Sequence, residues 1–225
     1  MIDITDVTLV IPAKNESESL PKVLDELKKF EVKKLVVMSE NDTDTFNSIK
    51  SYDAKVFFQT GKGFGNALRE GIKSIDSKYF CVFNADGSFD PNDLGKLRKK
   101  LYEGSDFVFS SRYLKGAGTE DDTFLTSIGN FFFTKLCNLL FNLNISDVLY
   151  TYVMGSTKAF NSLDMEYDDF SFCVELPIKA KKKNYVLSDF PSFERSRIAG
   201  LKKVNEFKDG FLILISILRL LIFDK

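Results

Sequence analysis

Short apolar runs alternate with apolar residues at helical spacing along the first half of the chain, and this pattern predicts an α/β fold. The runs that predict buried strands are residues 7–12, 34–38, 54–58, 79–83 and 106–111. Strands and helices that alternate at short range build a mostly parallel sheet with crossover helices on its faces. We therefore expect a Rossmann-like central sheet.

Helices are expected between these strands. The first carries Leu20, Val23, Leu24 and Leu27 at helical spacing. Another follows the glycine-rich turn GKGFG and runs to about Ser74. A third begins at Pro91, because proline is favourable at a first helical position, and reaches about Tyr102.

The second half departs from this regular alternation. A loop over 114–122 that is rich in glycine and acids comes before an apolar helix predicted at 131–143. A strand around 148–154, a helix around 172–183 and a strand at 185–191 are expected next. No break in composition marks a boundary, so we expect one domain over 1–203 and a helical appendage over 204–225.

The appendage contains residues 211–223, which are apolar on nearly every side except at Ser216 and Arg219. A membrane-spanning helix needs about 20 such residues, so this segment is too short to span. It could instead pack on the core, join a second subunit in a homodimer, or lie in a membrane interface. The run from Lys179 to Lys208 just before it holds nine Lys or Arg and three Asp or Glu, which would suit anionic lipid.

Composition narrows the classes of function. The net charge of the 225 residues is −1, which gives no global sign of a nucleic-acid partner. Cys81, Cys137 and Cys173 are isolated in apolar surroundings, as expected of buried thiols in a reducing compartment. The N-terminus shows no signal-peptide pattern, so we expect a cytoplasmic protein, either free or peripheral on the membrane.

The chain has no histidine, which excludes Ser-His-Asp and Cys-His catalysis and any imidazole base. Its chemistry must use carboxylates, Lys or Arg, hydroxyls, backbone groups or a hard metal ion. Polar clusters follow three predicted strands, at 12–16, 39–44 and 84–88. In an open parallel sheet, ligands bind outside the carboxyl ends of the strands, so these clusters predict a ligand crevice.

Asp86 lies in the third cluster and could bind Mg²⁺ or Mn²⁺ together with substrate phosphates. The competing interpretation of a single Asp at a strand end is a turn or a helix cap. The segment Gly61-Lys62-Gly63 could cradle a phosphate, but it is too short for a P-loop.

Six segments in order carry a resemblance to a known family: VIPAKNE, VVMSENDTD, GKGFGNALREG, FNADGSFDP, DFVFSSRYLKGAG and DFPSFERSRIAGLKKVNEFKDG. The chain resembles the family 2 glycosyltransferases of GT-A fold from about Val7 to Gly210. It is most similar to the branch that contains dolichol-phosphate mannosyltransferase and the bacterial polyprenyl-phosphate glycosyltransferases.

The resemblance implies roles for individual residues. Pro12, Ala13, Asn15 and Glu16 would line the nucleotide pocket. Ser39 and Glu40 would face base and ribose, with Asp44 at a later acidic position, and Lys62 and Gly63 would close over the nucleotide. The Asp-x-Asp of the family maps to Asn84-Ala85-Asp86, and Ser88 would add a metal contact. Arg112 would lie near the transferred sugar and the acceptor phosphate, whereas Glu175, Arg195 and Arg197 match later polar positions of less certain role.

Three positions depart from the family pattern. Ser39 and Asn84 each replace an Asp, and residues 124–130 lack an arginine that relatives often carry before the Gly-Asn. An Asn carbonyl still accepts a hydrogen bond but binds a metal less strongly than a carboxylate does. We interpret the departures as altered specificity.

The resemblance implies inverting transfer of a hexose from a UDP- or GDP-sugar to a polyprenyl phosphate, with Mg²⁺ or Mn²⁺ and with Asp86 and Arg112 as catalytic residues. An ionised phosphate acceptor needs no general base. The alternatives are transfer to a glycan hydroxyl, with Glu120, Asp121, Asp122 or Glu175 as base, or a sugar-nucleotide-binding relative without turnover. A nucleotidyltransferase is disfavoured because no glycine-rich loop accompanies the first strand.

Overall fold

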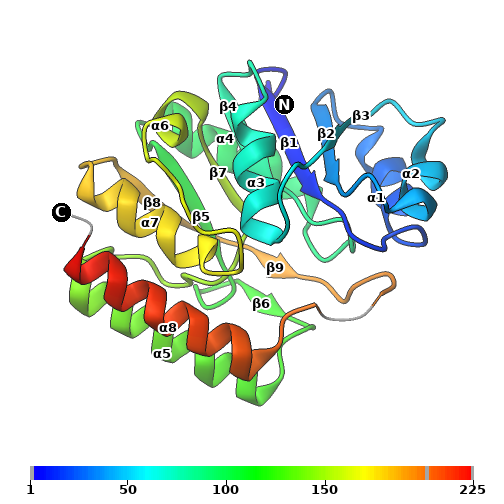
Figure 1. Cartoon of the computed structure of the whole chain (residues 1–225). Helices are drawn as coiled ribbons and strands as arrows, with labels where there is room; N and C mark the ends of the chain where they lie inside the picture. Colours follow the sequence, from blue (N-terminus) through cyan, green and yellow to red (C-terminus); the bar gives the residue numbers. More distant parts are fainter. Residues whose placement is uncertain (1–2, 201–202, 224–225) are drawn as a thin grey trace.

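The structure, a computed structural model, describes residues 3–200 and 203–223. Within these residues a seven-stranded sheet has the order β3-β2-β1-β4-β7-β5-β8 (Figure 1). Its strands are β1 Val7–Pro12, β2 Lys33–Met38, β3 Lys55–Phe58, β4 Tyr79–Val82, β5 Phe107–Ser111, β7 Val153–Ser156 and β8 Leu187–Pro191.

The main sheet is parallel except at one strand. β1 pairs in parallel with β2 and β4, β2 with β3, and β5 with β8. β7 alone runs the other way, between β4 and β5. The prediction of a mostly parallel sheet is confirmed, and the carboxyl ends of β1, β2, β4 and β5 therefore meet at one edge.

Helices cover both faces of this sheet, because its central strands are buried on both sides. One core joins Val10 and Val37 to the helices of one face. These are α3 Phe64–Lys73, α6 Thr157–Asn161 and α7 Phe172–Lys182, with α5 Phe124–Phe141 and α8 Glu206–Ile222 beyond them. The second core joins Leu9 and Ile11 to α1 Leu20–Leu27 and α4 Leu94–Tyr102. Cys81, Cys137 and Cys173 are buried free thiols, as predicted.

Two short strands form a second, small sheet at the edge of the main sheet where β1 ends. The short strands β6 Gly118–Thr119 and β9 Phe193–Glu194 pair in parallel and cross below this edge (Figure 1). Helices α5 and α8 lie side by side beneath them. The two helices run in the same direction, since Thr126 near the start of α5 donates to Glu206 at the start of α8 over 2.9 Å.

Several boundaries differ from those expected from the sequence. α5 begins at Phe124 rather than 131, because the Thr123 hydroxyl caps it by accepting from the Thr126 amide. β7 begins at Val153 rather than near 148, because residues 148–152 form a largely buried loop. A 3₁₀ turn, η1 Pro91–Asp93, precedes α4. Helix α2 Thr43–Ile49 lies where the sequence suggested only a polar cluster.

The predicted appendage corresponds to α8, and only part of it packs on the molecule. Ile213, Ile217 and Leu220 join the core, while the opposite side of the helix is exposed. Leu201 and Lys202, next to the expected boundary at 203, lie outside the described residues. The division at 203 therefore stays a prediction.

Candidate active site

The loops after β1 and β2 are joined at the strand-end edge. Pro12 ends β1 opposite Val37, and the Ala13 amide donates to the Val37 carbonyl over 2.8 Å. Asn15 adopts a left-handed conformation with φ 53°, which asparagine tolerates, and its amide donates to the Asp42 carboxylate over 2.7 Å. The predicted pocket residues of the first cluster thus lie against the second cluster.

Glu16 is buried rather than open to a ligand. Its carboxylate accepts from the Ser19 hydroxyl over 2.6 Å and forms an ion pair with Lys203. Its amide donates to the Thr45 hydroxyl over 2.9 Å. In this arrangement Glu16 fixes the start of α1 and the chain that leads to α8.

Ser39 and Glu40 are exposed at the end of β2, where a bound nucleotide could reach them. Asp42 is a neighbour that the sequence interpretation missed. It caps α2 by accepting from the Thr45 amide and also holds the Asn15 amide. The signal for it was an Asp just before Thr43-Asp44-Thr45, which is a typical N-cap position.

The GKG turn, residues 61–63, is held in one conformation by its glycine and by hydrogen bonds from the neighbouring residues. Gly63 has φ 112°, and a Cβ there would lie 2.1 Å from the Asp168 carbonyl oxygen, so only glycine fits. Glu70 on α3 accepts from the Thr60 amide and hydroxyl, both at 2.7 Å. Burial raises the pKa of Glu70, but these bonds and one from Asn66 outweigh it and hold the pKa below its ordinary value. Lys62 is exposed at the tip of this turn.

The predicted metal loop, residues 84–88, is a closed turn. One Asp86 carboxylate oxygen accepts from the Ser88 amide over 3.0 Å, and the Asn84 amide group donates to the Ser88 hydroxyl over 3.2 Å. The turn interpretation is confirmed, because one Asp86 oxygen accepts from the Ser88 amide, and the metal-ligand role of Asp86 stays a prediction. Its other oxygen, Oδ2, lies 4.0 Å from Arg197 Nη1.

The oxygen donors of this loop fit a hard cation whose coordination a bound substrate would complete. Among residues 3–200 and 203–223, no group of three or more acids or thiols could hold an ion by itself. The candidate oxygens are the Asp86 Oδ2 and the side-chain oxygens of Asn84 and Ser88, of which the Ser88 hydroxyl is buried. Mg²⁺ commonly binds through one or two carboxylates together with substrate phosphates and waters.

Arg112 follows β5 and is the centre of a buried charge cluster. It pairs with Asp147 at 2.7 Å and with Asp122 and Glu194 at 3.1 Å each. Burial alone would lower the pKa of Arg112, but the Asp147 charge holds it well above its ordinary value. Three carboxylates already compensate this guanidinium, so the expected contact with an acceptor phosphate would require these pairs to open.

The other polar residues carried over from the family are also engaged within the chain. Glu175 is fully buried in α7, where it pairs with Lys179 and accepts from the Glu166 and Tyr167 amides, so it ties the preceding loop to the helix. Arg195 pairs with Glu26 through two bonds of 2.8 and 3.0 Å. Glu120 and Asp121 accept from Ser196 and Arg197, so both acids make contacts within the chain, although Glu120 is exposed.

Residues 193–200, which we call the strap, lie across the metal loop. The Arg195 amide donates to the Ser88 carbonyl over 2.9 Å, and the Ile198 amide donates to the Asp86 carbonyl over 2.7 Å. Gly87 has φ 86°, and the Ile198 side chain occupies the space where a Cβ would lie. The sequence pattern gave no indication of this contact, because it joins segments about a hundred residues apart.

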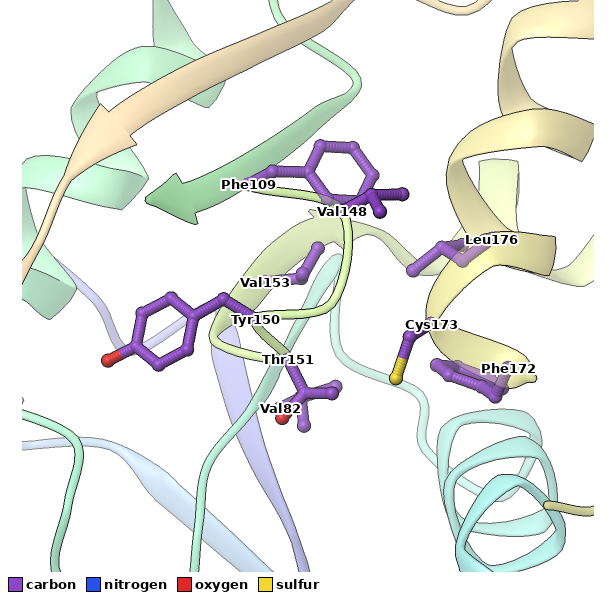
Figure 2. A pocket seen from close by; sticks show the side chains of 9 residues that line it. All are labelled: Val82, Phe109, Val148, Tyr150, Thr151, Val153, Phe172, Cys173 and Leu176. Atoms are coloured by element: carbon purple, nitrogen blue, oxygen red, sulfur yellow. The ribbon is translucent and has the colours of Figure 1, made fainter. Parts of the chain in front are cut away.

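A small cavity of about 10 Å³ lies between the sheet and α7 (Figure 2). Apolar side chains such as Val82, Phe109 and Leu176 line it, with Cys173 facing the gap. It has room for about one water, and it contains none of the predicted site residues. The cavity is therefore a packing defect beside the site rather than a substrate pocket.

Comparison with known proteins identifies the family. The family described as "Glycosyl transferase family 2" matches residues 8–164, which is most of the sheet and the strand-end edge. The chain belongs to glycosyltransferase family 2.

Relatives cover nearly the whole family 2 chain. The dolichyl-phosphate hexose transferase of Haloferax volcanii is 24% identical, covering 98% of this chain and 96% of the relative. Glycosyltransferase AglJ of the same organism is also 24% identical, covering 95% of this chain and 71% of the relative.

The fold matches that of solved GT-A enzymes. Glucosyl-3-phosphoglycerate synthase from Mycobacterium tuberculosis, solved with Mn²⁺, UDP and its product, has a TM-score of 0.74 at 15% identity, covering 96% of this chain and 79% of that one. The predicted GT-A fold is confirmed.

Proposed function

We propose that this chain transfers a hexose, with inversion, from a UDP- or GDP-sugar to a polyprenyl phosphate at a membrane surface. The observation that carries this proposal is an exposed apolar surface beside the strand-end edge. The relative named a dolichyl-phosphate hexose transferase supports the same acceptor class.

The donor would bind across the ends of β1, β2 and β4. Exposed Ser39 and Glu40 would meet the base and ribose, beside Pro12, Ala13 and Asn15. Lys62 and the backbone at Gly63 would approach from the GKG turn and favour a phosphate. UDP and Mn²⁺ in the solved glucosyl-3-phosphoglycerate synthase support a nucleotide-sugar donor and a divalent cation.

Asn84, Asp86 and Ser88 would hold Mg²⁺ or Mn²⁺ together with the donor. When bound, such an ion neutralises the diphosphate and stabilises it as a leaving group. The turn that fixes Ser88 to Asp86 keeps the carboxylate oriented without using its second oxygen. The chain's own contribution is therefore orientation of the donor at the strand ends.

The α5–α8 apolar face supports the lipid acceptor. It consists of the exposed side chains of Phe124, Leu125, Ile128, Phe131, Phe132 and Leu139 on α5, and of Phe207, Phe211, Ile215, Leu218, Leu221 and Ile222 on α8. Exposed apolar side chains that gather on two neighbouring helices are typical of interaction surfaces, and the exposed Lys135, Lys208 and Arg219 on the same helices would suit anionic lipid.

The face lies next to the site. Asp122, which pairs with Arg112 at the end of β5, comes directly before the cap of α5. Among the described helices, α5 alone is long and apolar enough to cross a membrane, but it lies alongside α8 with Asn130, Thr134 and Cys137 buried. We therefore propose a peripheral position in the membrane interface, on the cytoplasmic side.

A phosphate acceptor also suits the chemistry of the chain. A phosphate monoester has a second pKa of about 6, so it is largely doubly ionised at neutral pH. Its oxygen can therefore attack without a general base. Three arginines near the site already pair with acids, namely Arg112, Arg195 and Arg197. Lys208 is exposed and is one basic residue that could instead face the acceptor.

The test is transfer of radiolabelled sugar from UDP-glucose or GDP-mannose, with Mn²⁺, to undecaprenyl or dolichyl phosphate in vesicles. We expect labelled lipid with the wild-type chain and a loss of at least about a hundred-fold with Asp86→Asn. Asp90→Asn is the matched control, because the Asp90 carboxylate bonds only to Asn92 at the start of η1 and an Asn oxygen can accept the same bonds.

Labelled product with 3-phosphoglycerate or a glycan, and none with the lipid phosphates, would reject the lipid acceptor. Divalent-dependent nucleotide binding without any product would instead support a non-catalytic relative.

A further inference from the structure

Arg197 lies between two carboxylates at the centre of the candidate site. Its Nε and Nη2 contact the two oxygens of Asp121 at 3.1 and 2.5 Å. Its Nη1 lies 4.0 Å from Asp86 Oδ2, the oxygen that the turn leaves unused. The side chains of Arg197 and Asp86 are 23% and 17% exposed, so the pair is partly shielded from solvent.

The backbone holds Arg197 in this position. The strap is bonded to the metal loop on either side of it, through the Arg195 and Ile198 amides. Ile198 also packs on Gly87, where no side chain could fit. The fold thus holds the Arg197 backbone over the predicted metal loop, and the two bonds to Asp121 orient its guanidinium.

A guanidinium and a divalent cation cannot both neutralise Asp86 Oδ2 at short range without repelling each other. We propose that Arg197 is the resident counter-ion of Asp86 and that a divalent cation exchanges with it when the donor binds. This proposal rests on the metal site of the proposed function. Arg197 is a positioning residue here, since it acts through Asp86.

Asp121 gives the exchange a second partner. A bidentate contact orients the guanidinium by two parallel bonds, so Arg197 stays attached to Asp121 after it leaves Asp86. Asp121 therefore favours the cation by drawing Arg197 away from the metal loop. Removing Asp121 should strengthen the hold of Arg197 on Asp86, and removing Arg197 should free Asp86.

The experiment is a titration of the full chain with Mn²⁺, with and without UDP, in which the free Mn²⁺ is measured by electron paramagnetic resonance. We expect Arg197→Gln to bind Mn²⁺ about three- to ten-fold more tightly than wild type, and Asp121→Asn about three-fold more weakly. The double variant should bind like Arg197→Gln, because Asp121 acts through Arg197.

Matched controls separate this effect from net charge. Arg195→Gln removes a charge two residues away that is paired with Glu26, and Glu120→Gln removes the acid next to Asp121. Neither should change Mn²⁺ affinity by more than about two-fold.

The outcomes distinguish the two proposals. If Asp86→Asn binds Mn²⁺ as wild type does, the metal assignment is wrong and the exchange proposal is rejected with it. If Asp86→Asn weakens Mn²⁺ binding but Arg197→Gln equals wild type or binds more weakly, only the exchange proposal is overturned. If Arg197→Gln does not fold, Asp121→Asn and Glu120→Gln decide the question, and equal Mn²⁺ affinities for these two variants overturn the exchange.

Discussion

At the scale of single residues, the metal loop combines a local constraint with an unusual donor set. One Asp86 oxygen accepts from the Ser88 amide, and the Asn84 amide group donates to the Ser88 hydroxyl. The loop is therefore ordered before any ligand arrives. An amide oxygen at position 84 carries less negative charge than the carboxylate that the family resemblance leads one to expect, so it would weaken the proposed cation binding.

Asn84→Asp should raise Mn²⁺ affinity about ten-fold, because a second carboxylate at the predicted metal loop adds charge where the cation would bind. The Ser88 hydroxyl can reverse its hydrogen bond and donate to the new acid. The measurement is the Mn²⁺ dependence of UDP binding by calorimetry. Asn92→Asp makes the same charge change at an exposed position on η1 and should leave the affinity unchanged. Equal affinity for Asn84→Asp and wild type would mean that residue 84 does not face the cation.

The residues of the strand-end loops could be named from sequence, but their partners could not. Asn15, Ser39 and Asp86 were found because polar residues after parallel strands share an edge. Arg112 was placed near the acceptor by resemblance, yet the structure surrounds it with Asp122, Asp147 and Glu194. These ion pairs join positions 10 to 82 residues apart, and no periodicity in the chain encodes such pairings.

At the scale of elements, the strands and the longer helices follow from apolar periodicity, and the exceptions have physical causes. α2 was missed because its seven residues carry few apolar side chains and depend on the Asp42 cap. α5 was predicted to begin too late, because Gly129 interrupts the apolar pattern. In the structure the Thr123 cap nonetheless starts the helix at Phe124. The strands β6 and β9 are two residues each, too short for any alternation to show.

The α5–α8 apolar face makes a prediction at this scale. Phe132→Asp combined with Phe211→Asp should lower co-sedimentation with anionic vesicles about ten-fold, because both aromatic side chains are lost from the surface that would enter the interface. The two side chains are 52% and 64% exposed, so unfolding should stay near the wild-type temperature.

Tyr102→Asp is the matched control for that experiment. Tyr102 is 83% exposed on α4, which packs on the opposite face of the sheet. Its change should leave vesicle binding intact. If the double variant binds vesicles normally but changes from dimer to monomer in light scattering, the face is a subunit interface and the membrane proposal is wrong.

At the scale of the whole molecule, the candidate site connects the sheet to the apolar helices. The loop before α5 and the strap before α8 pair as β6 and β9, and both are tied to Arg112 through Asp122 and Glu194. The buried Asp147 holds the same arginine from the loop that follows α5. One guanidinium therefore links β5, both helix entrances and the edge of the sheet.

Arg112→Met should lower the free energy of unfolding by about 3–5 kcal/mol, because it leaves buried carboxylates without their counter-ion. Arg98→Met is the comparison: Arg98 makes two bonds to Asp6, but Asp6 is 34% exposed, so the loss should be about 1 kcal/mol. Urea unfolding at neutral pH measures both. Adding Asp147→Asn to Arg112→Met should restore part of the loss, since one uncompensated charge is removed. Equal losses for the two arginine variants, or no recovery in the double variant, would show that Arg112 does not hold the loops and the sheet edge together.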